Sequence, residues 1–222
     1  MAASPVLHDL EARYDVRFTL PQPRTLERIP TGISTIDTLA SGGIPRGALT
    51  EIYGPASSGR TSLLLALMAN VTQTSVCALI DTSDAFDPAS AAEAGVHLSR
   101  VLWIRCGGNA EHALKTADLI VQAGGFGLIA MDLADTPPRT AGRISLASWF
   151  RLRHAVERTP AALVVLAQTL HAKSCSSLQL ELRKEEVRWS GEQFGKLLRG
   201  MRVRAESAKH HQAQSAAFEV HR

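Results

Sequence analysis

Short, continuous apolar runs recur through the middle of the chain, at residues 48–53, 76–81, 101–105, 128–132 and 162–168. The segments between them include stretches of helical length, such as residues 110–122 and 145–158. Strands that are apolar throughout and alternate with helices are typical of a parallel sheet covered on both faces. The pattern therefore predicts an α/β fold with a central, mostly parallel sheet flanked by helices.

The pattern changes after residue 177. Leu178, Leu180 and Leu182 alternate with polar residues, and positions 201, 203 and 205 do the same. Alternation with a period of two indicates strands that have one solvent-exposed face. We expect these strands to extend the sheet in antiparallel fashion, joined through residues 189–191, with a last strand at residues 216–220.

The first 30 residues form a separate segment. Ser4 and Pro5 precede apolar residues at positions 6, 7, 10 and 14, which predicts a short amphipathic helix. Prolines at positions 21, 23 and 30 then indicate an extended linker. We therefore divide the chain into a helix with its linker (residues 1–30) and a core (residues 31–222), and the sequence leaves open whether the helix packs on its own core or on a neighbouring subunit.

The composition indicates one folded core. The chain has 222 residues, of which 45% are hydrophobic and 20% are charged. No apolar run approaches the roughly 18 residues of a membrane span, and the N-terminus lacks the basic and apolar parts of a signal peptide, so we expect a cytoplasmic protein without a membrane partner. The three cysteines are too widely spaced to suggest a disulfide framework or a zinc site, and we expect Cys77 to pack in a strand.

The net charge of +3 is unevenly distributed. Residues 1–138 carry 9 basic and 14 acidic side chains, whereas residues 139–222 carry 15 basic and 7 acidic ones. A basic half favours contact with a polyanion, but arginines on solvent-exposed helix faces would produce the same count. The sequence leaves both interpretations open.

The apolar run 48–53 leads into a glycine-bounded loop and the start of a helix, with the sequence Gly54-Pro55-Ala56-Ser57-Ser58-Gly59-Arg60-Thr61-Ser62. This matches the phosphate-binding pattern G-x-x-x-x-G-K-[ST] at every fixed position except one. The two glycines permit positive φ, so that consecutive N–H groups and the helix N-terminus face phosphate oxygens. A plain strand-to-helix turn is the alternative, and the strand before and helix after favour the phosphate site.

Arg60 stands where the pattern has lysine. Lysine reaches the terminal phosphates as a compact point charge, and Thr61 would place its hydroxyl on Mg²⁺. Arg60 keeps the positive charge, but its planar guanidinium is larger and binds in a different geometry. We expect ATP and Mg²⁺ to bind here with weak or absent hydrolysis, through Gly54, Pro55, Ser57, Ser58, Gly59, Arg60, Thr61 and Ser62.

Two further polar residues end apolar runs. Asp132 ends residues 128–132 in the form of a Walker B element, whose carboxylate helps to hold Mg²⁺. Many buried strands end in Asp at a turn, but the position two strands beyond the glycine loop favours the metal. Gln168 ends the next run, where it would sense the terminal phosphate, and a surface glutamine is the alternative.

Three stretches together resemble the core of the bacterial RecA recombinases: residues 31–37, residues 42–47 and residues 51–59. Leu79-Ile80-Asp81, Asp87-Pro88, Ala91 and Gly95-Val96 extend the resemblance, which covers residues 31–168. It implies a RecA-type ATP-binding core, with Thr61 and Asp132 near Mg²⁺ and Asp87 near the adenine. The family's two DNA-binding loops would fall at residues 134–143 and 169–174, which makes Arg139, Arg143 and Lys173 candidates for contact with single-stranded DNA.

The departures from RecA fall on groups that accelerate hydrolysis. Besides Arg60, the position of the glutamate that activates the attacking water is occupied by Ser83, which cannot act as a carboxylate base. Asp84 lies one residue along, with a shorter side chain than glutamate. A late Lys-x-Lys pair that completes the neighbour's ATP site in RecA is replaced by Glu206-Ser207-Ala208.

A short RecA-like chain with a weakened ATPase site, ending before the C-terminal domain of the family, resembles the ImuA type of RecA homologue. This resemblance implies a weakly hydrolysing or non-hydrolysing accessory of translesion synthesis in the SOS response. Its expected partners are a recombinase filament or a translesion polymerase complex, with self-association as a further candidate. The alternative is an active DNA-dependent ATPase or recombinase, and a small-molecule kinase is disfavoured because the resemblance extends well beyond the loop.

Overall fold

The computed structural model describes residues 26–191, 195–207 and 214–221. The helix and most of the linker expected in residues 1–30 lie outside these ranges. Within them, no helix is both long enough and apolar enough to cross a membrane.

The described elements follow the predicted alternation of strands and helices. The α-helices are α2 (Ser34–Leu39), α3 (Arg60–Val71), α4 (Pro88–Glu93), α5 (Ala110–Ala123), α6 (Pro138–Ala141) and α7 (Leu146–Val156), and the 3₁₀ turns are η1 (Leu98–Arg100) and η2 (Lys173–Cys175). The strands are β1 (Arg28–Ile29), β2 (Ile44–Pro45), β3 (Ala48–Tyr53), β4 (Cys77–Asp81), β5 (Val101–Arg105), β6 (Leu128–Asp132), β7 (Ala162–Ala167), β8 (Leu178–Ser190), β9 (Leu197–Ser207) and β10 (Gln214–His221).

The main sheet of the described chain has the strand order β10-β9-β8-β3-β7-β6-β4-β5. Neighbours from β8 to β5 pair in parallel, whereas β9 pairs antiparallel with both β8 and β10. The predicted α/β class, with a mostly parallel sheet and an antiparallel C-terminal extension, is confirmed. The small β1–β2 pair is antiparallel and lies outside this sheet.

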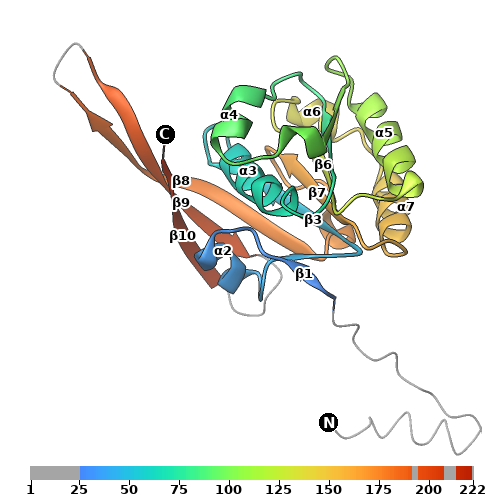
Figure 1. Ribbon diagram of the computed structural model, residues 1–222. Helices are drawn as coiled ribbons and strands as arrows, with labels where there is room; N and C mark the ends of the chain where they lie inside the picture. The colour runs from blue at the N-terminus through green and yellow to red at the C-terminus, as the bar shows by residue number, and fades with distance from the viewer. Residues whose placement is uncertain (1–25, 192–194, 208–213, 222) are drawn as a thin grey trace, which may run out of the picture.

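Alternate residues of the central strands enter two hydrophobic clusters on opposite faces of the sheet. On one face, strand residues such as Ile52 and Leu79 pack with α2 and α3. On the other face, residues such as Ile80 and Val165 pack with α5 and α7. The two helical layers are visible in Figure 1. Continuous apolarity in the strands is explained by this coverage, because every side chain of a doubly covered strand is buried.

The C-terminal strands form a long ribbon that leaves the body of the molecule (Figure 1). Residues 178–181 of β8 pair with residues 50–53 of β3, and β8 pairs with β9 from residue 180 to residue 190. Trp189 and Ser190 belong to β8, so the expected junction at residues 189–191 was placed too early, and the turn begins at Gly191. At the far end of the ribbon Trp189 and Leu197 are more than half exposed.

Candidate nucleotide-binding site

The glycine loop connects β3 to α3 at the carboxyl edge of the parallel strands, where open α/β sheets bind ligands. Gly59 has φ 89° and precedes the first residue of α3. A Cβ at Gly59 would lie 2.8 Å from Cγ2 of Val203 on β9, and one at Gly54 would lie 2.1 Å from the carbonyl oxygen of Leu182 on β8. The glycines are therefore required by packing against the C-terminal ribbon as well as by the turn, a constraint that the motif alone did not reveal.

The backbone of this loop presents unpaired donors. The N–H groups of residues 56–62 have no hydrogen-bond acceptor among the described residues, while the N–H of Gly54 donates to the carbonyl oxygen of Ala167 at 3.2 Å. Ser57 also has a positive φ, of 58°, and the buried hydroxyl of Ser58 has no partner within the described chain. Consecutive free N–H groups at a helix N-terminus form an anion cradle. The loop therefore fits a phosphate group.

The side chain of Arg60 is bonded to the same carbonyl oxygen, that of Ala167, that accepts the N–H of Gly54. It is 5% exposed, and its Nη1 donates a hydrogen bond of 2.6 Å to the carbonyl oxygen of Ala167 at the end of β7. Burial lowers the pKa of the guanidinium, and the nearby carboxylates of Asp132 and Asp135 oppose that shift. The guanidinium that stands at the lysine position of the motif is therefore buried and bonded to the protein backbone.

Three of the predicted site residues meet at one cavity of about 190 Å³ beside the loop. Thr61 at the start of α3, Asp132 at the end of β6 and Asp87 before α4 line it, together with Asp135 and Phe86. Asp87 is also the N-cap of α4, because its carboxylate accepts hydrogen bonds from the backbone N–H groups of residues 89 and 90. A second cavity of about 450 Å³ follows between α3, α4 and β10, and Ser62 lies in its wall.

The carboxyl group of Asp132 in this cavity has a raised pKa. Burial raises the pKa of its carboxyl to about 6, and the charges of Asp81 and Asp135 act in the same direction. The N–H of Ala134, which donates to Oδ1 at 2.8 Å, and the charge of Arg60 partly offset the shift. A divalent cation would relieve this repulsion. The hydroxyl of Thr61 and the carboxylate of Asp132 are the hard oxygen donors that suit Mg²⁺, and since the described residues contain no cluster of three metal-ligating side chains, phosphate oxygens and water would complete its coordination.

Asp81 organises the loop after β4, a role that the sequence did not reveal. Its buried carboxylate accepts hydrogen bonds from the N–H groups of Ala85 (3.1 Å) and Phe86 (2.9 Å) and from Nε1 of Trp103 (3.1 Å). The rings of Phe86 and Trp103 meet edge to face at 5.3 Å. Asp81 therefore shapes the wall of the smaller cavity.

The carboxylate nearest to the missing glutamate position is also engaged. Ser83 stands at that position, and Asp84, with φ 58°, pairs with Nη2 of Arg105 at 3.1 Å. The guanidinium of Arg105 lies 5.4 Å from the centre of the Trp103 ring. Asp84 is thus held by β5 on the outer side of this loop.

Gln168 follows β7 and bridges to the loop after β6. Its Nε2 donates to the carbonyl oxygen of Ala134 at 3.0 Å. The amide therefore connects the ends of two neighbouring strands next to Asp132. Its predicted contact with a terminal phosphate stays a prediction.

Residues 169–174, where the second DNA-binding loop was expected, fold back onto the α7 side of the sheet. The fully buried carboxylate of Glu51 accepts hydrogen bonds from the N–H groups of His171 (2.6 Å) and Ala172 (2.9 Å). Ala172 and Cys175 are fully buried in the cluster that contains α7. Lys173 thus lies in a short, anchored segment. The hint in the sequence was a glutamate inside a mostly apolar strand.

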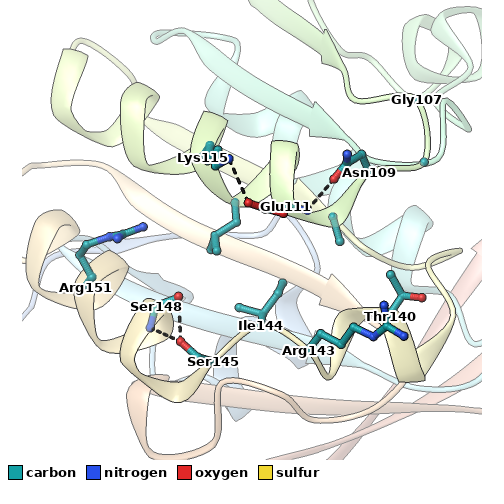
Figure 2. Close-up of a pocket in the computed structure, with 13 residues that line it drawn as sticks. Gly107, Asn109, Glu111, Lys115, Thr140, Arg143, Ile144, Ser145, Ser148 and Arg151 are labelled. Carbon is teal, nitrogen blue, oxygen red and sulfur yellow. Dashed lines mark hydrogen bonds and ion pairs between the residues drawn. The ribbon is translucent and has the colours of Figure 1, made fainter.

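Arg143 lies on the wall of a larger cavity, of about 630 Å³, between α5 and the start of α7. Figure 2 shows Lys115 and Glu111 on one side, Arg151 and Ser148 on the other, and Ile144 between them. Lys115 pairs with Glu111 at 2.9 Å, and Arg151 pairs with Asp118 at 3.6 Å. Neither Arg143 nor the exposed Arg139 of α6 has an ion-pair partner among the described residues.

The arginines of the ribbon are largely neutralised. Arg183 pairs with Glu181 at 2.6 Å, and Arg202 and Arg204 pair with Glu185 at 3.4 Å and 2.5 Å. Arg188 pairs with Glu219 on β10. Much of the basic excess of the C-terminal half is therefore held in ion pairs along the ribbon. The unpaired cations at α6 and the start of α7 are the better candidates for a polyanion.

Comparison with known proteins supports one family. The family model described as the RecA N-terminal domain matches residues 16–141. Protein RecA of Methylococcus capsulatus is 40% identical over 111 residues, which cover 49% of this chain and 32% of that relative. Protein RecA of Borrelia duttonii is 39% identical over 114 residues, and that of Cutibacterium acnes is 42% identical over 106 residues, covering 31% and 30% of those relatives. The matched part thus spans about a third of the curated relatives. Because the family model covers more than half of the 222 residues and the fold has the expected parallel core, the chain belongs to the RecA family.

Proposed function

We propose that this protein is a RecA-like nucleotide-binding protein of DNA repair that hydrolyses ATP slowly or not at all. It acts as an accessory in damage tolerance, of the ImuA type, and not as a strand-exchange enzyme. The observation that carries the proposal is the state of Arg60, whose buried guanidinium donates to the carbonyl oxygen of Ala167.

Binding of phosphate is supported by the backbone. The free N–H groups of residues 56–62 are available to donate hydrogen bonds to phosphate oxygens. Thr61 and Asp132 supply oxygen donors for Mg²⁺. These groups do not depend on Arg60. When bound, Mg²⁺ would neutralise phosphate charge, and the protein's own part is to orient the ligand and screen it from water.

Hydrolysis lacks its usual groups. A water attacking the terminal phosphate needs a carboxylate base or an orienting group. Ser83 is not a base, and Asp84 is paired with Arg105 at 3.1 Å. Gln168 donates its amide to Ala134. The cation that would stabilise the transition state is tied to the protein, because the guanidinium of Arg60 is buried and donates to the carbonyl oxygen of Ala167.

Contact with single-stranded DNA is proposed for Arg139 and Arg143. Both lack an ion-pair partner among the described residues, and both lie where the resemblance places the first DNA-binding loop. The second loop contributes at most Lys173, because Glu51 holds this segment against the sheet. Such contacts to phosphates bind DNA without reading its sequence.

An ATPase assay with and without single-stranded DNA tests the central claim. We expect turnover at least about a hundredfold below that of a full-length RecA measured in parallel, because a carboxylate base and a phosphate-facing cation each contribute factors of about 10²–10⁴. Turnover comparable to RecA that disappears in Arg60→Ala would instead support the alternative, an active DNA-dependent ATPase.

Charge reversal tests the DNA surface. The double variant Arg139→Glu/Arg143→Glu should weaken binding to single-stranded DNA and reduce its salt dependence. Arg158→Glu, an exposed arginine beyond the other end of α7, is the matched control. Equal losses in both variants, or no loss in the double variant, would remove this surface as the binding site.

The accessory role is tested in cells. Deletion of the gene should lower the frequency of mutations induced by DNA damage while homologous recombination stays at its normal frequency. A recombination defect equal to that of a RecA deletion would contradict the accessory role.

A further inference from the structure

The C-terminal ribbon carries one face of the sheet beyond the body of the molecule (Figure 1). Near the body this face is marked by Val203, which is buried in the same cluster as residues of α2 and α3. Farther out, Val187 pairs with Met201, and Trp189 pairs with Leu198. Paired residues share a face, and alternate residues of a strand return to it. These four side chains, which we call the ribbon stripe, therefore continue the face of Val203.

The ribbon stripe becomes more exposed towards the far end of the ribbon. Met201 packs against the cluster of α2 and α3, Val187 and Leu198 are partly exposed, and the side chain of Trp189 is 58% exposed. In the body of the molecule, helices cover this same face of the sheet. An exposed indole next to three apolar side chains is stabilised by any partner that removes it from water.

The opposite face of the ribbon neutralises its own charge. Arg188 pairs there with Glu219, and Arg202 and Arg204 pair with Glu185. Acidic and basic side chains of this face therefore satisfy one another within the chain.

The ribbon stripe has a lysine at each end. Lys184 pairs with Val203 in the register and so shares its face, at the end nearer the body. Lys196 lies at the other end, directly before β9. Both are exposed, and neither has an ion-pair partner in the part of the chain that the structure describes. The exposed Glu186 lies on the opposite face, because it pairs with Arg202 in the register.

We propose that the ribbon stripe binds an amphipathic helix of another protein, which has apolar residues at its centre and acidic residues at both ends. Its apolar side chains cover Trp189 and its neighbours, as α2 and α3 cover the body of the sheet, and its acidic side chains pair with Lys184 and Lys196. The two lysines lie about six strand positions apart, roughly 20 Å. This span corresponds to roughly 13 residues of an α-helix. The surface is separate from the nucleotide site, so the proposal holds whether or not ATP is hydrolysed.

Charge favours an acidic partner over a second copy of this chain. Two ribbon stripes packed face to face would bring the lysines of both copies together, and like charges across an interface repel each other. Because a lysine stands at each end of the stripe, neither direction of packing avoids this repulsion. A helix with acidic ends replaces the repulsion with attraction.

A synthetic helix of about 16 residues is the probe. It carries leucines along one face of its central turns and glutamates near both ends. A side-chain lactam on its polar face holds it helical, because a free helix of this length is marginal in water. A second peptide has lysine in place of each glutamate. Fluorescence anisotropy of the labelled peptides with the full chain should show that the acidic peptide binds at least about tenfold more tightly than the basic one.

Three variants locate the binding surface. Trp189→Ser should weaken binding of the acidic peptide at least about tenfold, because aromatic side chains at the centre of an interface dominate its affinity. The double variant Lys184→Glu/Lys196→Glu should reverse the preference between the two peptides. Leu119→Ser is the matched control, since this leucine of α5 is 67% exposed and lies outside the ribbon, and its affinity should stay unchanged. Circular dichroism checks that each variant is folded.

Equal affinity for the two peptides would overturn the proposal, and so would unchanged affinity in a folded Trp189→Ser or failure of both peptides to bind. Two further results would assign the ribbon stripe to another occupant and overturn the proposal as well. The first is a dimer of the full chain in sedimentation velocity that dissociates in Trp189→Ser, which indicates a second copy. The second is binding of the acidic peptide that appears only after deletion of residues 1–25, which indicates the N-terminal segment of this chain.

Discussion

Glu51 links the nucleotide strand to the segment after β7, and Glu51→Gln tests that link. The carboxylate is fully buried and accepts hydrogen bonds from the N–H groups of His171 at 2.6 Å and Ala172 at 2.9 Å. Glutamine keeps one oxygen but turns an NH₂ group towards the second N–H, so one buried donor loses its acceptor. An unsatisfied buried donor costs about 1–3 kcal/mol, and a hydrogen bond to a charged group is stronger than one to a neutral amide. We expect the free energy of unfolding to fall by about 2–4 kcal/mol.

Urea unfolding at neutral pH measures the global loss for Glu51→Gln, and amide hydrogen exchange at His171 and Ala172 measures the local one. Glu186→Gln, an exposed glutamate on β8, is the control and should change stability by less than about 0.5 kcal/mol. A loss for Glu51→Gln no larger than that of the control, with unchanged protection of both amides, would refute the assigned role.

Three further predictions follow from packing and ionisation. Gly59→Ala should destabilise the protein more than Gly108→Ala, since both glycines have positive φ (89° and 80°) but a Cβ is crowded to 2.8 Å only at Gly59; the difference in urea midpoints isolates the clash, and equal losses would contradict it. Asp132→Asn should raise stability at pH 7 by up to about 3 kcal/mol, because a carboxyl pKa raised to about 6 makes the folded state hold a proton that the unfolded state has lost above about pH 4. Stability of the unaltered protein therefore falls as pH rises from about 4 to 6, and the two midpoints should converge below pH 4; a constant difference would exclude this cause. Burial raises the pKa of the Cys77 thiol to about 12, so a thiol reagent at pH 8 should modify Cys77 in urea and not in the folded protein, which mass spectrometry of the labelled peptide checks.

The fold was predictable because its signals are local. The apolar runs of β4, β6 and β7 indicate that both faces of these strands are covered. The switch to alternation after residue 177 marks the place where one face becomes solvent-exposed. The ends of the ribbon strands were less predictable, because the distal part of β8 is polar on most positions and is held by its pairing with β9 rather than by a buried face.

The residues of the nucleotide site were predictable to different degrees. Gly54, Gly59 and Thr61 stand in a contiguous motif, and Asp132 ends a strand, so their meeting at one edge of a parallel sheet follows from the topology. Glu51 escaped functional assignment because its partners are backbone N–H groups about 120 residues further along the chain. Asp81 escaped it because its partners are backbone N–H groups of the next loop and the indole of Trp103. In the sequence, both residues are recognisable only as a carboxylate in a mostly apolar strand.

The sequence by itself determined that this chain has a RecA-type core and that a lysine is replaced at the phosphate loop. It did not determine what the replacement does. Arg60 finds its acceptor 107 residues away, at Ala167, because β3 and β7 are neighbours in the sheet and bring the two positions to the same edge. Only the tertiary structure decides whether a cation at position 60 contacts phosphate or a backbone carbonyl group. The same residue can make either contact, and the fold determines which acceptor lies close enough to its side chain.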